Sequence, residues 1–207
     1  MANSARRSLR LPRWPTLHHE RELGCRVCGV DEAGCAPLAG PVVAAAVVLP
    51  EGPKPRALRG LTDSKLLDAE ARSGFAAAIR RLGAVGVGIA SVEEIDALNI
   101  YHADRLAMQR AVADLPCEPE AALVDGRGAP ELPIPVRTLV KGDRRSLSIA
   151  AASVIAKETR DAIMRELARV HPAYGWETNA GYGTDAHYLG LLRCGPTSHH
   201  RRTFAPL

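Results

Sequence analysis

Four acidic residues stand where apolar segments end, and they are the side chains with which this sequence could do chemistry. Asp31 and Glu32 close a first apolar segment, Asp125 closes a second, and Asp143 follows a third. If these segments are strands of one sheet, their ends meet at one edge, where α/β proteins bind ligands. Carboxylates gathered there repel one another unless cations lie between them. Oxygen ligands without a His or Cys spaced for zinc favour Mg²⁺ or Mn²⁺.

Such a metal centre suggests a reaction. Two divalent ions about 3.5–4 Å apart can activate a water and stabilise the leaving oxygen in phosphodiester cleavage. The alternative is that these acids are ordinary turn and capping residues, because Asp125-Gly126 is a common turn and Asp143 precedes a predicted helix. The residues by themselves leave both interpretations open.

The adjacent pair Asp31 and Glu32 sets a geometric condition on the metal hypothesis. Neighbouring residues of a strand point to opposite faces, so these two can share a metal only if the chain bends after Asp31. Gly34 and Pro37 would allow that bend. We therefore expect the first strand to end at Asp31.

The elements that would position these acids follow from the hydrophobic pattern and the turn residues. Short apolar runs predict strands at 26–31, 42–49, 84–90, 121–124 and 136–140. Longer runs with capping residues predict helices from an Asp68 cap to 82, over a short stretch after Ser91, and at 100–115, 147–170 and about 185–192. This order predicts an α/β fold with a mixed central sheet flanked by helices and a C-terminal helical segment.

The composition excludes several classes of protein. With 46% hydrophobic and 24% charged residues among 207, the chain is too apolar to be disordered. It also has no uncharged apolar run of about 18 residues to span a membrane. The net charge of +4 resides in residues 1–30, which hold six Arg and two Glu. We expect residues 1–21 to be a basic flexible arm, which could attract nucleic acid, although a solvated tail is the favoured interpretation.

The cysteines and the N-terminus indicate a compartment. Five irregularly spaced cysteines are typical of reduced thiols. Cys25 and Cys28 form the one close pair, and the second pair that a zinc site usually needs is missing. No secretory signal is recognisable, because Pro12 and Pro15 interrupt the N-terminus and no apolar segment follows. We expect a cytoplasmic monomer that contacts no membrane.

Short motifs surround the acids in a distinctive order. They are Gly29-Val30-Asp31-Glu32-Ala33-Gly34, residues 37–47, Asp63-Ser64-Lys65, residues 94–100, 108–112, 123–126, 140–143 and 149–153, Thr159-Arg160-Asp161, Gly181-Tyr182-Gly183-Thr184 and His200-Arg201. Together they resemble ribonuclease HII of bacteria over about residues 24–206, and the combination is highly specific.

The resemblance implies an RNase H-like fold, in which residues 22–207 form a catalytic domain with a C-terminal extension. It implies an endoribonuclease that hydrolyses the RNA strand of RNA–DNA hybrids, or that cuts on the 5′ side of ribonucleotides embedded in duplex DNA, leaving a 3′-hydroxyl. The family's catalytic, metal-binding acids map onto Asp31, Glu32, Asp125 and Asp143, and the implied cofactor is Mn²⁺ or Mg²⁺.

The resemblance also implies substrate contacts. In relatives, the loop after the first acids reads the 2′-hydroxyl at the RNA–DNA junction, partly through backbone groups, alongside a tyrosine that maps onto Tyr182. That loop is Gly34-Cys35-Ala36 here, where the family usually has Gly-Arg-Gly. Cys35 removes a cation that could hold phosphate, and Ala36 disfavours a positive φ. Lys65 is a further candidate for a phosphate contact.

The altered loop leaves two alternatives. One is a degenerate paralogue that binds nucleic acid without useful turnover, and the four intact acids argue against it. The other is a nuclease with relaxed specificity at the junction.

Overall fold

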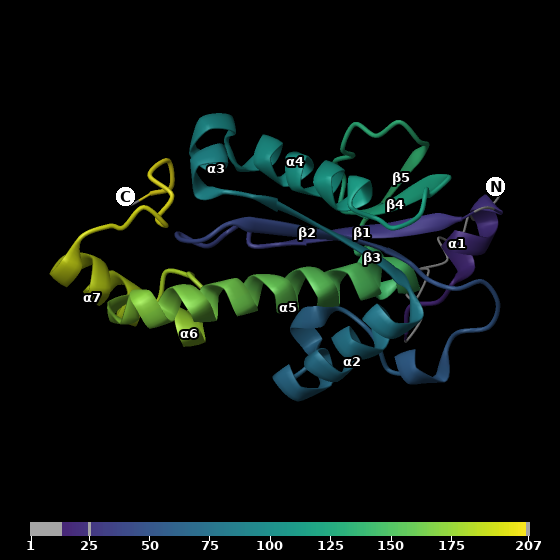
Figure 1. Cartoon of the computed structure of the whole chain (residues 1–207), viewed down its shortest axis with the longest axis horizontal. Coiled ribbons are helices and arrows are strands. Elements are labelled where there is room, and N and C mark those ends of the chain that lie inside the picture. Colours follow the sequence, from purple (N-terminus) through teal and green to yellow (C-terminus); the bar gives the residue numbers. More distant parts are fainter. Residues whose placement is uncertain (1–13, 25, 206–207) are drawn as a thin grey trace, which may run out of the picture.

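A mixed five-stranded sheet forms the middle layer of the computed structural model, which describes residues 14–24 and 26–205 (Figure 1). The strand order is β3-β2-β1-β4-β5. β2 pairs antiparallel with both β1 and β3, whereas β4 pairs parallel with both β1 and β5. The strands are β1 (Val27–Ala33), β2 (Val42–Val48), β3 (Ala84–Ala90), β4 (Ala121–Asp125) and β5 (Val136–Leu139).

Helices cover both faces of the sheet (Figure 1). α5 (Leu147–Val170) and α2 (Ala69–Leu82) pack on one face, and α4 (Ile100–Ala113) and α3 (Val92–Leu98) pack on the other. β2 is buried along its whole length and contributes to both cores, because its alternate side chains point to opposite faces. None of the helices that the structure describes is both long and apolar enough to cross a membrane. The sheet with helices on both faces confirms the predicted α/β architecture.

Small residues let α5 approach the sheet closely. The helix is buried from Leu147 to Ala156, a stretch rich in alanine. Gly29 of β1 lies against this stretch, and a Cβ added there would come within 2.1 Å of the Ser148 carbonyl carbon. The beginning of α5 is therefore held tightly against β1, which fixes the position of the chain just before the helix.

The predicted helix ends agree with the structure where capping residues mark them. The Asp68 side chain accepts a hydrogen bond from the N–H of Ala71 at the start of α2. Ser91 and Glu94 form a reciprocal capping box at the start of α3. A capping side chain bonds to a backbone N–H only two or three residues away, so a few neighbouring residues are enough to predict where a helix begins.

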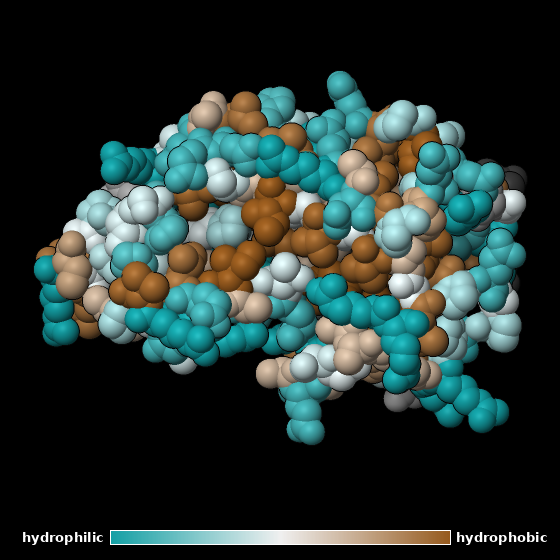
Figure 2. Space-filling view, in the orientation of Figure 1, coloured by the Kyte–Doolittle hydropathy of each residue, from teal (hydrophilic) through white to brown (hydrophobic). Residues whose placement is uncertain are grey.

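The open edge of the sheet at β3 is protected by charged side chains. Figure 2 shows an apolar band across the middle of the face in view, between more hydrophilic regions. Ile89 of β3 is 40% exposed. The Asp114 carboxylate accepts a hydrogen bond from the N–H of Val87, and Arg110 donates to the carbonyl of Ile89. Occupied edge groups of this kind make a strand a poor template for pairing with another chain.

The N-terminal region departs from the predicted flexible arm. α1 (His18–Leu23) is folded against the domain, and Leu17 is buried in the core that faces α5. Glu20 accepts hydrogen bonds of 2.7 Å from the hydroxyls of Ser146 and Ser148. Residues 14–21 therefore belong to the folded domain, because apolar burial and a buried carboxylate fix them. The rest of the expected arm, residues 1–13, lies outside the described residues.

The C-terminal segment is helical, as predicted. It contains the 3-10 turn Pro172–Tyr174, α6 (Trp176–Asn179) and α7 (Asp185–Cys194). Elsewhere in the chain, further 3-10 turns occur at Arg56–Leu58, Ser64–Leu66 and Gly142–Arg144. The Nε1 of Trp176 donates to Nε2 of His187, which lies 3.0 Å from Nε2 of His200. Both histidines are buried among aromatic rings. They pack the C-terminal segment together.

Candidate active site

The ends of two parallel strands place Asp31 and Asp125 side by side. β1 and β4 are in register up to the pair Val30 and Val124, so the next residue on each strand is one of these acids. Adjacent strands lie about 4.8 Å apart. Side chains two residues apart on a strand point to the same face. Gly29 and Leu123, two positions before Asp31 and Asp125, face α5, so both carboxylates belong to that face.

Asp143 joins them from the turn before α5. The N–H of Gly142 donates to Oδ1 of Asp125 at 2.6 Å, which ties this turn to the end of β4. A Cβ added to Gly142 would come within 2.6 Å of the Ile149 side chain and 3.2 Å of Oδ1 of Asp125, so a larger residue would require those side chains to shift. Lys141 adopts a positive φ of 56° to start the turn. The sheet and α5 thus bring together acids that are more than 100 residues apart in the chain.

The expected bend directly after Asp31 is wrong. β1 continues through Ala33, so Asp31 and Glu32 stand on opposite faces of one strand. Glu32 still reaches the site because β4 ends at Asp125 and leaves that edge of β1 uncovered. The side chain also faces α4, on the side of the sheet where Val30 and Cys28 pack.

All residues assigned to the site from the sequence line one cavity of about 390 Å³. It lies at the edge of the sheet where β1 and β4 end. Its lining contains the predicted acids, loop residues, lysine and tyrosine: Asp31, Glu32, Asp125, Asp143, Gly34, Cys35, Ala36, Lys65 and Tyr182. It also contains residues that were not assigned a role: Asp63, Ser64, Ser153, Lys157 and Arg160.

Burial and mutual repulsion disfavour the charged forms of the carboxyl groups in this cavity. Burial, together with the charges of Glu32 and Asp125, raises the pKa of Asp31 well above its usual range. Burial also raises the pKa of Glu32. Burial and the charges of Asp63 and Asp125 raise the pKa of Asp143 to about 6. Buried carboxylates that destabilise one another's charged forms are a donor set suited to divalent cations with oxygen ligands.

A buried arginine shapes the loop that follows β1. Arg201 has no exposed surface and donates to the carbonyls of Gly34, Cys35 and Gly40 at 2.5–3.0 Å. In a trans peptide the N–H points away from the carbonyl, so the N–H groups of Cys35 and Ala36 face away from Arg201. Ala36 is not among the residues with positive φ. The alanine therefore fits this loop without backbone strain.

A second buried arginine joins this loop region to the segment that carries Tyr182. Arg160 of α5 donates to the carbonyls of Pro41, Ala39 and Ala180 at 2.9–3.0 Å. Tyr182 follows Ala180 closely and is 43% exposed, so its ring is available at the rim of the cavity. Arg160 thus fixes two separate loops relative to one helix.

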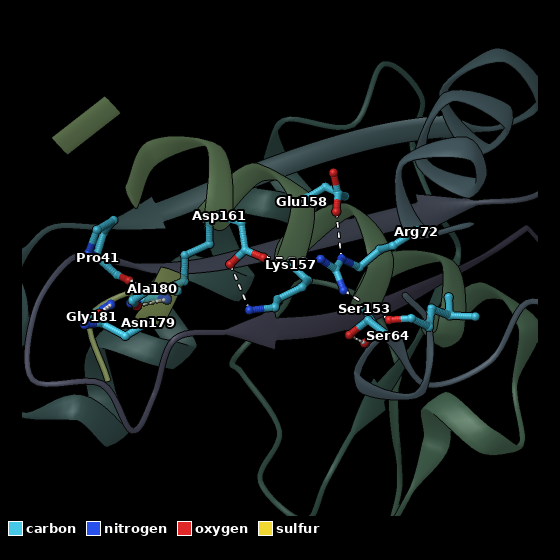
Figure 3. A network of polar contacts seen from close by, with 12 residues as sticks. Pro41, Ser64, Arg72, Ser153, Lys157, Glu158, Asp161, Asn179, Ala180 and Gly181 are labelled. Atoms are coloured by element: carbon cyan, nitrogen blue, oxygen red, sulfur yellow. Dashed lines mark hydrogen bonds and ion pairs between the residues drawn. The ribbon is translucent and has the colours of Figure 1, made fainter. Parts of the chain in front are cut away.

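Polar pairs lie beside the cavity, within α5 and between α5 and its neighbours (Figure 3). Arg72 of α2 pairs with Glu158 of α5 at 2.7 Å, and Lys157 pairs with Asp161 at 2.8 Å. The hydroxyls of Ser64 and Ser153 lie 2.9 Å apart. The contact between Ser64 and Ser153 holds the 3-10 turn Ser64–Leu66, and with it Lys65, against α5.

Sequence reasoning missed several residues that shape the site. Asp63 accepts from Lys65 N–H and pairs with Arg144, and it influences the pKa of Asp143. Arg160 and Arg201 act through backbone carbonyls far away in sequence. The available signal was their presence in the motifs Asp63-Ser64-Lys65, Thr159-Arg160-Asp161 and His200-Arg201, but their partners could not be read from the chain.

A mixed sheet in this order, with carboxylates gathered at the ends of β1 and β4, defines a protein of the RNase H-like fold. Solved structures agree. Ribonuclease H2 from Pyrococcus horikoshii superposes with a TM-score of 0.71 at 26% identity, over 87% of this chain and 94% of that one. The structure of the PCNA:RNase HII complex from Archaeoglobus fulgidus gives a TM-score of 0.69 at 25% identity, over 86% and 95%.

The family model for ribonuclease HII matches residues 28–206. Ribonuclease HII of Granulibacter bethesdensis is 58% identical over 188 residues, which are 89% of this chain and 86% of the relative. That of Paramagnetospirillum magneticum is 55% identical over 194 residues, 93% and 96% of the two chains. The chain belongs to the ribonuclease HII family, and it is an endoribonuclease of the ribonuclease H type.

Proposed function

We propose that the protein hydrolyses the RNA strand of RNA–DNA hybrids and cuts at ribonucleotides embedded in duplex DNA, with metal-ion catalysis. The observation that carries this proposal is that Asp31, Glu32, Asp125 and Asp143 line a single cavity. The bond that breaks is P–O3′ on the 5′ side of a ribonucleotide, and water supplies the oxygen that joins phosphorus. The products then carry a 3′-hydroxyl and a 5′-phosphate.

The four carboxylates would hold Mg²⁺ or Mn²⁺. Their donors are oxygen atoms, which these hard ions prefer. Two such ions, when bound, would lower the pKa of an attacking water and stabilise charge on the departing 3′-oxygen. Within the chain, the N–H of Gly142 holds Oδ1 of Asp125 in place, and the start of α5 holds Asp143 near it. The protein's own contribution is thus to fix oxygen ligands from separate elements before substrate binds.

Substrate recognition would use backbone groups and an aromatic ring. The N–H groups of Cys35 and Ala36, turned away from Arg201, are suited to donate hydrogen bonds to the 2′-hydroxyl oxygen. Tyr182 would stack on the sugar or base at the junction, and Lys65 would contact phosphate. The 2′-hydroxyl is then a recognition element and not the nucleophile.

The alternatives suggested by the altered loop are not favoured. A paralogue without turnover has no reason to keep four mutually repelling carboxylates in one cavity. Relaxed junction specificity would follow if Ala36 distorted the loop, but its φ is not positive and Arg201 still binds two of the loop's carbonyls.

We propose that the enzyme works as a cytoplasmic monomer.

The test is a cleavage assay on three duplexes of one sequence, with a single ribonucleotide, four consecutive ribonucleotides, or DNA alone. Each is assayed with Mg²⁺, with Mn²⁺ and with EDTA. We expect metal-dependent cutting of the first two and none of the third. Asp31→Asn should lose more than about 100-fold in rate while retaining binding of the duplex. Glu166→Gln, on the exposed surface of α5, is the matched control. Unchanged cleavage by Asp31→Asn would contradict the role of Asp31.

A further inference from the structure

A second group of potential metal ligands lies on the α4 side of β1. The strand directs Glu32 to this side and Asp31 to the α5 side, and the Glu32 carboxylate also contacts the carboxyl of Asp31 at the strand edge. Glu32 meets the side chains of Cys35, from the loop after β1, and Asp104, from α4. One ligand atom of each residue lies within 4.8 Å of the other two. The group thus draws on a strand, a loop and a helix.

One oxygen of Asp104 supplies a second sign that this group lacks a ligand. The carboxyl contacts the Cys35 thiol, but its Oδ1 atom is buried and accepts no hydrogen bond from any residue that the structure describes. A buried carboxylate oxygen without a donor or cation is costly, since its hydration is lost and nothing replaces it. A cation bound beside Cys35 and Glu32 would satisfy this oxygen.

We propose that Glu32, Cys35 and Asp104 form a binding site for a thiophilic divalent ion such as Zn²⁺ or Co²⁺, which adjoins the four-carboxylate site and shares Glu32 with it. Sulfur and oxygen ligands together select these borderline-soft ions over Mg²⁺. Three protein ligands leave one position of a tetrahedral ion for water.

The geometry permits the ion to enter and to bind. Glu32 and Cys35 line the 390 Å³ cavity, so an ion can reach them from solvent, and Asp104 completes the site from the helix behind. Ligand atoms around a tetrahedral zinc are about 3–4 Å apart, so the group needs only to contract slightly. When the sulfur–metal bond forms, the S–H bond of Cys35 breaks and its proton passes to solvent.

The site has a consequence for catalysis that rests on the proposed function. Glu32 would belong to both groups, and it can direct its carboxylate fully to one of them at a time. An ion held by Cys35 and Asp104 would withdraw Glu32 from the four-carboxylate site. We expect micromolar Zn²⁺ to inhibit cleavage supported by Mg²⁺.

The direct test is a titration of the full-length protein with Co²⁺, because cobalt bound to thiolate gives an intense near-ultraviolet absorption that carboxylate and imidazole ligands do not produce. We expect this absorption to saturate in the wild type at an intensity that corresponds to one thiolate-bound cobalt ion per chain. Cys35→Ser, a nearly isosteric change, should abolish it, and Asp104→Asn should weaken binding at least 10-fold. Cys194→Ser, on the exposed end of α7, is the matched control and should bind as the wild type does. Circular dichroism establishes that each variant is folded.

Three results would overturn the site: no thiolate absorption in the wild type, absorption that persists in Cys35→Ser, or unchanged affinity in Asp104→Asn. The second arm measures inhibition by Zn²⁺ relative to each variant's own rate, and Asp104→Asn should need at least 10-fold more Zn²⁺. Equal inhibition in wild type and Asp104→Asn would refute the link to catalysis. Cobalt absorption in a protein that cleaves nothing would refute the proposed function and leave the site standing.

Discussion

Replacing Asp143 by Asn should stabilise the metal-free protein while it destroys the metal site. In the folded state burial, Asp63 and Asp125 raise the pKa of Asp143 to about 6 from its ordinary 3.8. That difference corresponds to at most about 3 kcal/mol of unfavourable charge. Because the carboxyl is only half-buried, solvent screening reduces the cost to about 1–2 kcal/mol. The amide has a similar shape and carries no charge, so it relieves this cost.

The pH dependence gives the prediction its sign. Below about pH 4 the carboxyl is protonated in both the folded and the unfolded chain, so it contributes nothing to the difference. As the pH rises towards 6, the unfolded chain ionises first and the stability of the wild type falls. Above pH 6 the whole cost is present. Asp143→Asn should therefore be more stable than the wild type at pH 8 and equal to it near pH 4.

The assay is urea unfolding in EDTA at about pH 4 and pH 8, with Glu166→Gln as a surface control that should change stability by less than about 0.5 kcal/mol. A second series contains saturating Mn²⁺, which should stabilise the wild type far more than Asp143→Asn. The order of stability at pH 8 should thus reverse on addition of metal. A variant that is less stable than the wild type in EDTA at pH 8 would refute the electrostatic reasoning.

Three further changes test the framework that positions the site. Gly29→Ala places a Cβ about 2.1 Å from the backbone of α5, so we expect a loss of at least about 3 kcal/mol in urea unfolding, and a loss under about 1 kcal/mol would contradict the close approach. Arg201→Lys leaves two of the three carbonyls that Arg201 binds without a donor, which should lower the free energy of unfolding by about 2–5 kcal/mol. It should also reduce selectivity for single ribonucleotides over RNA tracts, and unaltered selectivity would refute the positioning role of Arg201. Ser91→Ala removes the capping box of α3 and should lower stability by about 1 kcal/mol with no effect on cleavage; a change in cleavage rate would show that α3 influences the site.

Much of the fold could be predicted because its signals are local. The apolar runs that became β2 and β3, and the caps at Asp68 and Ser91, depend on residues within one element. The convergence of Asp31 and Asp125 could also be expected, because parallel strands end at one edge of a sheet. These inferences required only periodicity, turn chemistry and general topology.

The errors arose where distant contacts decide the structure. The bend after Asp31 was expected because two adjacent acids seemed to need one face. The structure instead ends β4 early and exposes the edge of β1. Residues 14–21 looked like part of a charged arm, yet Leu17 and Glu20 are held by α5 and the turn before it. Neither result could be read from neighbouring residues.

The most direct test of the account is Mn²⁺ binding measured by electron paramagnetic resonance of the free ion, on the wild type and on Asp31→Asn, Asp125→Asn and Asp143→Asn in turn. If carboxylates from β1, β4 and the turn before α5 share bound ions, the wild type should take up Mn²⁺ and each variant should bind it at least about 10-fold more weakly. Absence of uptake by the wild type, or equal affinity in any of the three variants, would contradict the claim that these elements build one metal site.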